Sequence, residues 1–437
     1  MSFTVVAFLL TILLFGIYDA RGEFANGLLK PKHNKVVVCY VASWAAYRPD
    51  KGAFSIGNLR PEFCTHLIYA FAGLNISSWT ISSLDPWADT EKDVIGNYRK
   101  MTALRQQYPG IKISLGIGGW NEGSKNYSQL ASSPERRRTF IASTIEFLKT
   151  YGFDGLDFDW EFPGSRGGVP DDKQNFASLV KELSDAYREP RLLLTAAISA
   201  DKKTIDQAYN IPEVSKYLDH ISVMAYDYHG TWDKKVLPNS PLRSNDGLSV
   251  EDSVTYLLQR GAPAEKLVLG LPMYGRTFIL TKEPEESNVN PIGLPALITG
   301  FKGPYTGQEG FMGFNEICEA LTKDPKDWST GWDNDISTAY AIKQDHVVVY
   351  DNIKTIMTKV EYAKKKKLAG VMVWSIDTDD FRGDCYGSEF PIMKAINKVL
   401  ANTTAFVAPP IAPNASSVQL FSYISLTLSI IMIYLTV

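Results

Sequence analysis

Short apolar runs alternate with amphipathic stretches along most of this 437-residue chain. Runs rich in Val, Ile, Leu and aromatic residues predict buried strands, while apolar residues at intervals of three and four predict helices. This pattern predicts eight buried strands, the fourth of which also carries acidic residues. They are expected at 36–41, 66–72 and 111–116, within 151–164, and at 192–198, 220–226, 267–273 and 371–376.

Amphipathic helices are predicted at 94–108, 134–151, 173–188, 249–260 and 353–367. Ser133 and Pro134 provide an N-cap and a first-turn proline for the second of these. Strands that alternate with helices favour a (β/α)8 barrel. The alternative is a doubly wound open sheet, but no Gly-x-Gly-x-x-Gly turn follows the first strand. The interval from Phe278 to about Tyr350 is too long for an ordinary loop.

The most distinctive stretch is 151–164, in which three carboxylates alternate with three apolar residues: Asp157, Asp159 and Glu161 with Leu156, Phe158 and Trp160. The period of two on a strand places the acids on one face. Three such acids repel one another at neutral pH, so at least one is expected to keep a proton and all three to titrate together. A retained proton at a strand end is what general-acid cleavage of an acetal requires. The competing interpretation is a metal-binding or solvated acidic edge.

Asp154 shares the parity of the apolar residues, so we expect a structural role for it where the strand begins. The whole run matches the Asp-x-x-Asp-x-Asp-x-Glu signature of family 18 glycoside hydrolases, which comprise chitinases and lectin-like relatives. The resemblance covers about residues 35–400, and the chain looks like an animal or arthropod chitinase. It implies a small α+β insertion at about 278–350 that forms one wall of a deep groove.

The resemblance also implies a mechanism in which the substrate's acetamido group replaces the second carboxylate of most glycosidases. Glu161 would protonate the glycosidic oxygen and later act as a base. Asp159 would orient the acetamido N–H and balance positive charge, while Asp157 shares a proton with Asp159. Lectin-like members lack the acid at the position of Glu161, and this chain keeps it. Phe162 departs from many relatives, which carry Tyr and hence a hydroxyl at that position.

Further site residues are expected at the carboxyl ends of the strands, where barrel enzymes place their active sites. Tyr226 would contact the acetamido oxygen, Asp227 would support the proton balance, and Trp374 would lie under the distorted sugar. Gly118 and Gly119 would let the backbone approach a ligand closely. The remaining predicted substrate-contacting residues are Tyr40, Trp44, Phe71, Trp87, Gly118, Gly119, Trp120, Asn121, Phe162, Met224, Tyr228, Tyr274 and Arg276.

Composition changes this picture little. The net charge of −3 gives no reason to expect nucleic acid as a partner. The 9 Trp, 22 Tyr and 21 Phe suit sugar stacking but also fill ordinary cores. Retaining hydrolysis of chitin is the favoured function, without a cofactor or metal and by a monomer. The alternatives are a catalytically silent chitin-binding protein and an endo-N-acetylglucosaminidase that acts on N-glycans.

Four cysteines allow three pairings in a secreted chain. Nearness in sequence favours Cys39 with Cys64, which leaves Cys318 with Cys385, and the family resemblance implies the same pattern. Because Cys318 lies inside the predicted insertion, its bond would join that wall to the barrel.

Both ends of the chain suggest processing. Residues 1–22 resemble a secretory signal, and N-glycosylation triplets occur at Asn75, Asn126, Asn402 and Asn414. A linker at 401–417 precedes a hydrophobic tail at 418–437, whose last 18 residues carry no charge. That length just spans a bilayer, yet no Lys or Arg follows it, and small residues precede it as in a lipid-anchor signal. We expect an extracellular barrel tethered to the membrane by a lipid or a transmembrane segment.

Overall fold

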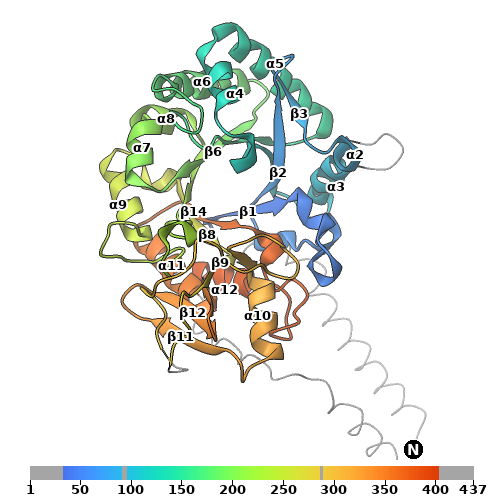
Figure 1. The fold of residues 1–437 in the computed structure, drawn as a ribbon. Helices are drawn as coiled ribbons and strands as arrows, with labels where there is room; N and C mark the ends of the chain where they lie inside the picture. The colour runs from blue at the N-terminus through green and yellow to red at the C-terminus, as the bar shows by residue number, and fades with distance from the viewer. Residues whose placement is uncertain (1–32, 91–95, 286–288, 403–437) are drawn as a thin grey trace, which may run out of the picture.

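Eight parallel strands close into a barrel in the computed structural model, which describes residues 33–90, 96–285 and 289–402 (Figure 1). The first strand pairs with both the second and the last, and this double pairing closes the sheet. The predicted (β/α)8 fold is confirmed. The barrel strands are β1 Val36–Ala42, β2 His66–Asn75, β4 Lys112–Gly118, β5 Gly155–Asp159, β6 Leu193–Ser199, β7 His220–Met224, β8 Leu267–Pro272 and β14 Gly370–Trp374.

Helices surround the barrel (Figure 1). The side chain of Ser133 accepts a hydrogen bond from the amide of Arg136 and caps α5 as predicted. The apolar pattern did not reveal several of the shorter helices. The barrel helices are α2 Pro86–Thr90, α3 Asn97–Ala103, α4 Lys125–Ser132, α5 Pro134–Tyr151, α6 Asp172–Tyr187, α7 Lys202–Ala208, α8 Ile211–Tyr217, α9 Val250–Gln259, α11 Ile353–Lys365 and α12 Pro391–Leu400.

Apolar side chains of the barrel form two separate clusters. The larger cluster lies between strands and helices, and Phe158 and Trp160 belong to it. The smaller one includes Tyr40, Phe71 and Met372, which come from three adjoining barrel strands. Since successive residues of a strand point to opposite faces, strands β1, β2, β8 and β14 contribute to both clusters.

A five-stranded antiparallel sheet and helix α10 (Phe314–Lys323) form the insertion, which lies on one side of the barrel (Figure 1). Its strands follow the order β10-β9-β13-β12-β11. The sheet begins at residue 274 rather than near 278, because β9 starts two residues after β8 ends. These strands are β9 Tyr274–Ile279, β10 Phe311–Gly313, β11 Ser329–Asp333, β12 Thr338–Lys343 and β13 His346–Tyr350. Strand β3 (Thr80–Ser83), antiparallel to β2, was not predicted.

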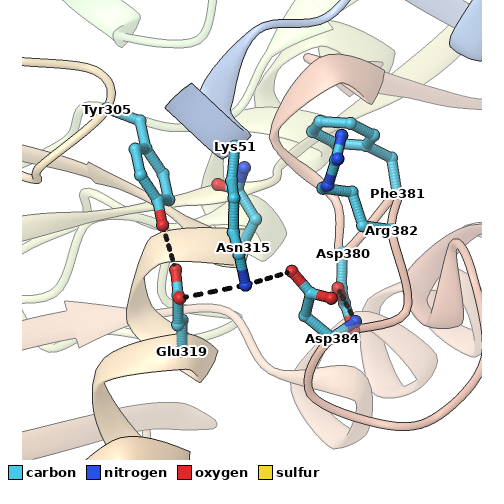
Figure 2. Close-up of a pocket in the computed structure, with 8 residues that line it drawn as sticks. All are labelled: Lys51, Tyr305, Asn315, Glu319, Asp380, Phe381, Arg382 and Asp384. Atoms are coloured by element: carbon cyan, nitrogen blue, oxygen red, sulfur yellow. Dashed lines mark hydrogen bonds and ion pairs between the residues drawn. The ribbon is translucent and has the colours of Figure 1, made fainter. Parts of the chain in front are cut away.

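Two disulfides join Cys39 to Cys64 and Cys318 to Cys385, the pairing that nearness in sequence favours. The second bond links α10 of the insertion to the segment after β14. A hollow beside it is lined by what we call the junction cluster: Lys51, Tyr305, Glu319 and Asp384 (Figure 2). The ammonium group of Lys51 lies 3.0 Å from Oδ2 of Asp384 and 3.7 Å from Oε1 of Glu319. The insertion is therefore fixed to the barrel by one covalent bond and by paired charges.

Several predictions on processing concern residues outside the described ranges, including the signal at 1–22, the tail at 418–437 and Asn414. Among the described residues, no helix is long and apolar enough to cross a membrane. Asn75 and Asn402 are exposed, whereas Asn126 is half-buried on α4. An exposed amide nitrogen suits glycan attachment better than a half-buried one.

Candidate active site

The acidic motif lies at the carboxyl end of β5. Phe158 contacts the rings of Phe140 and Phe176 on the surrounding helices. Asp157, one residue earlier, is fully buried and contacts Tyr40 of β1 instead. The predicted alternation therefore holds through Asp159. The strand ends there, so Glu161 lies on the following loop rather than on the strand itself.

Asp154 takes no part in this cluster. Its Oδ2 lies 2.6 Å from Nη1 of Arg105 and accepts the amide of Ile113 at 2.8 Å. The predicted structural role at the start of the strand is confirmed.

Asp157 and Asp159 differ in their hydrogen bonds. Asp157 accepts the hydroxyl of Tyr40 at 2.6 Å on one oxygen and that of Thr195 at 2.5 Å on the other. Oδ1 of Asp159 is buried and has no hydrogen-bond partner among the described residues. Burial raises the pKa of both groups, and nearby Glu161 and Asp157 raise the pKa of Asp159 further. The two hydroxyls favour the charged form of Asp157, so a proton shared by the pair resides mainly on Asp159.

Glu161 is also poised to hold a proton near neutral pH. Burial, followed by the charge of Asp227, raises its pKa to about 7, while the charge of Arg166 opposes this shift. Arg166 donates a hydrogen bond to the backbone carbonyl of Glu161 at 2.9 Å, and its guanidinium carbon lies 3.5 Å from the ring centre of Trp120. Among the described residues, no ion pair involves the carboxylates of Asp157, Asp159 or Glu161.

Tyr226 and Asp227 follow β7 and face β9 of the insertion. The Asp227 backbone has a φ of 57°, a left-handed conformation that few residues other than Gly adopt. Its Oδ1 accepts the hydroxyl of Tyr274 at 2.6 Å and lies 2.6 Å from Nη2 of Arg276. The rings of Tyr226 and Tyr274 meet edge to face at 6.1 Å. The insertion therefore contributes directly to this side of the site.

An aromatic group adjoins the acids. Trp374 stacks on Phe71 with ring centres 5.8 Å apart, and its edge contacts Tyr40 at 5.5 Å. Trp44 stacks on Phe71 at 6.2 Å and is 46% exposed. These four residues come from β1, the segment after it, β2 and β14. Tyr40 and Phe71 are buried, whereas Trp44 is exposed and Trp374 is half-buried, so these two rings are the ones that a sugar could stack on.

Gly118 and Gly119 are required for packing within the protein. A Cβ on Gly118 would lie 2.1 Å from the carbonyl oxygen of Asp159, and one on Gly119 would lie 2.7 Å from the Phe71 ring. Both have positive φ, at 111° and 84°. We predicted a close approach of a ligand here; the close approach that the structure shows is to β5 and Phe71.

Other predicted contacts are more dispersed. Tyr228 differs from the predicted substrate contact: it follows the left-handed Asp227, its ring is buried, and its hydroxyl contacts Ser249 and Ser253. Trp87 lies on α2, 67% exposed, and no ring contact joins it to the other predicted residues in the described chain. Three more predicted residues lie at the ends of barrel strands. Asn121 is exposed after β4, and Phe162 is half-buried after Glu161. Met224 ends β7 and packs against the smaller apolar cluster.

Thr195 and Arg166 were missed by sequence reasoning. Thr195 is the one hydroxyl in the apolar run 193–198, which is a usable signal for an inward polar contact. Arg166 gave no such signal, because its contacts depend on the path of a loop. For a metal, the described residues offer one group with suitable spacing, Cys318, Asp380 and Cys385, and its two sulfur atoms are joined in a disulfide.

Comparisons with known proteins agree with this geometry. The model of the glycosyl hydrolases family 18 matches residues 36–379. Probable chitinase 2 of Drosophila melanogaster is 49% identical over 365 residues, which cover 81% of this chain and 74% of that protein.

Solved structures give the same result. The Group IV chitinase of Ostrinia furnacalis in complex with allosamidin is 41% identical, with a TM-score of 0.80 over 85% of this chain and 100% of that one. Human YKL-39, described as a pseudo-chitinase with retained chitooligosaccharide binding, is 34% identical, with a TM-score of 0.74 over 84% of this chain and 99% of that one. The extent of these matches shows that the chain belongs to glycoside hydrolase family 18.

Proposed function

We propose that this protein is a chitinase that cleaves the β-1,4 linkages of chitin and chito-oligosaccharides with retention of the anomeric configuration. The observation that supports it most is the state of Glu161, a largely buried carboxyl whose pKa is raised to about 7 by burial and by Asp227. Such a group keeps a proton to donate at near-neutral pH and can take one back afterwards.

In the first step, Glu161 transfers its proton to the glycosidic oxygen as the bond to the anomeric carbon breaks. The acetamido carbonyl oxygen of the same sugar attacks that carbon and forms an oxazolinium ion. The hydroxyl of Tyr226 donates to the acetamido oxygen and directs it. Asp159 accepts the acetamido N–H and its negative charge stabilises the ion, while the proton of the pair moves to Asp157.

In the second step, water attacks the anomeric carbon from the side that the leaving group vacated. Glu161, now charged, accepts a proton from this water, and the acetamido group is restored. Two inversions give net retention. The stacked rings of Trp374 and Phe71 provide the floor on which the sugar rests, and Asp227 maintains the raised pKa of Glu161 between turnovers.

The likeness to named chitinases and to a chitinase–allosamidin complex supports chitin as the substrate. The aromatic group of Trp44, Phe71 and Trp374 suits a linear chain of sugars, which stacks ring after ring. The carboxyl that this chain carries at Glu161 favours an active enzyme over the silent chitin-binding alternative.

Proton NMR of fresh chitotetraose digests tests the proposal, since the products must first appear as the β anomer. Products that first appear as the α anomer would overturn the mechanism. Binding of chitotetraose without any turnover would instead identify a silent binding protein. Release of glycans from a glycoprotein, with chitotetraose untouched, would identify an endoglycosidase.

We extend the proposal to the fate of the chain: residues 1–22 direct secretion, Asn75, Asn126 and Asn402 receive glycans, and the tail at 418–437 tethers a monomeric enzyme to the cell surface. The apolar character of the two end segments supports this. Phosphatidylinositol-specific phospholipase C is expected to release the enzyme from cells. If it stays bound and an epitope placed after Val437 survives, the tail is a transmembrane anchor.

A further inference from the structure

A chain of buried polar residues holds the segment that carries Tyr226 and Asp227. The amide of Asp227 donates to Oδ1 of Asn239 at 3.0 Å, and the amide of Tyr228 donates to the Asn239 carbonyl at 3.1 Å. Asn239 is almost fully buried. The left-handed backbone of Asp227 costs free energy and persists only where its surroundings hold it. Asn239 supplies part of that support.

Ser240 makes the second contact to the same segment. Its hydroxyl donates to the carbonyl oxygen of Ala225 at 2.6 Å and accepts a hydrogen bond from Nζ of Lys359 at 2.8 Å. Because an ammonium group can only donate, Lys359 fixes the direction in which the serine hydroxyl points its proton. Asn239 and Ser240 together therefore hold both sides of Tyr226 and Asp227.

Lys359 comes from α11 and is completely buried. Its ammonium group lies 2.6 Å from Oδ1 of Asp351, the residue that follows the last strand of the insertion. A buried ion pair loses its hydration and needs well-placed hydrogen bonds in return. Asp351 and Ser240 supply these bonds, so the charge of Lys359 is held at a fixed point behind the catalytic segment.

We propose that Asn239, Ser240 and Lys359 are positioning residues for Tyr226 and Asp227, with Lys359 acting through Ser240. The inference rests on the catalytic roles proposed above for those two residues. The inference adds that Asp351, at the end of the insertion, helps to fix the positions of Tyr226 and of the Asp227 charge beside Glu161.

Ser240→Ala is the first test. It removes the hydroxyl and leaves the Lys359–Asp351 pair in place. Ser253→Ala is the matched control, since Ser253 is also buried, also donates to a backbone carbonyl at 2.6 Å, and shares a hydrogen bond with the hydroxyl of Tyr228. Hydrolysis of chitotetraose across pH and hydrogen exchange of the 225–228 segment without ligand are measured for both variants.

For Ser240→Ala we expect kcat to fall about tenfold, because small displacements of reacting groups are costly. Asp227 raises the pKa of Glu161. Its displacement therefore moves the alkaline limb of the rate profile to lower pH, and exchange of the segment becomes faster. In Ser253→Ala the alkaline limb of the rate profile is expected to stay at the pH of the wild type. A double variant, Lys359→Met with Asp351→Leu, removes the ion pair without leaving one charge unpaired and is expected to reproduce the shift of Ser240→Ala.

An alkaline limb and an exchange rate that both stay at their wild-type values in Ser240→Ala and in the double variant would overturn the inference. So would an equal shift in Ser253→Ala, because a general loss of stability would then explain it. Exchange is read without substrate, so a wild-type enzyme that fails to cleave chitotetraose would refute the proposed function while the exchange rates still decide the inference.

Discussion

The acid cluster at the end of β5 and the junction cluster beside the insertion contain the same kinds of residue and behave oppositely. In the junction cluster, Glu319 accepts the hydroxyl of Tyr305 and lies near Lys51 (Figure 2). It also pairs with Lys323, and although burial opposes the shift, these partners lower the pKa of Glu319. In the acid cluster, Tyr40 also donates to a carboxylate, yet no cation of the described ranges forms an ion pair with the acids, and burial raises their pKa.

The difference shows that nearby cations and hydrogen-bond donors can outweigh burial and hold a carboxylate in its charged form, whereas burial beside other acids favours its proton. The two clusters also affect stability with opposite signs. Glu161 has a raised pKa, so its contribution to the free energy of unfolding is present at low pH. This contribution is lost as the pH rises from 4.5, the ordinary pKa of a glutamate, to about 7. Glu319 has a lowered pKa, so its contribution to the free energy of unfolding is present above pH 4.5 and is lost as the pH falls below that value.

Removal of the proton donor is expected to have the largest effect. Glu161→Gln keeps the shape of the side chain but cannot give up a proton to the leaving oxygen. We expect kcat to fall by at least about a hundredfold, with binding of chitotetraose retained in calorimetry. Glu319→Gln in the junction cluster is the matched control and is expected to keep kcat. Undiminished hydrolysis by Glu161→Gln would show that another group is the acid.

Asp159→Asn removes the charge that balances the oxazolinium ion. Because that charge matters most as the ion forms, kcat is expected to fall by about a hundredfold while the affinity for chitotetraose changes little. Steady-state kinetics and calorimetry on the same preparation separate the two effects. A loss confined to affinity would make Asp159 a contact residue only.

Arg166→Gln sharpens the role of charge beside Glu161. The positive charge of Arg166 lowers the pKa of Glu161, so its removal should raise that pKa and move the alkaline limb of kcat/KM to higher pH. Arg136→Gln is the control, since Arg136 lies over Trp79 in a similar cation–π contact. If the alkaline limb stays at its wild-type pH or moves to lower pH, the charge of Arg166 does not lower the pKa of Glu161.

Lys51→Met breaks the junction cluster and is expected to have the smallest effect. Lys51 is half exposed, so loss of its ion pairs should cost below about 1 kcal/mol of unfolding free energy and leave kcat unchanged. Denaturant unfolding measures this, with Lys282→Met, an exposed lysine of the insertion, as control. A large loss of kcat would show that the junction controls the site.

The sequence predicted those features that depend on local periodicity. Apolar runs located the eight strands, Ser133 and Pro134 located the start of α5, and the parity of Asp154 set it apart from the acids. The remaining features depend on the paths of loops, which periodicity does not encode. The left-handed turn at Asp227 redirects Tyr228 into the core, and the loop after β5 brings Arg166 to Glu161.

Carbon-13 NMR titration of the glutamate carboxyls tests the central claim most directly, with Glu161→Gln used to assign the resonance of Glu161. The account predicts that this carboxyl titrates near pH 7, as part of a coupled set, while Glu319 titrates below the ordinary value of 4.5. A Glu161 resonance that titrates at or below 4.5 would contradict it, because the acid cluster would then hold no proton to donate at neutral pH.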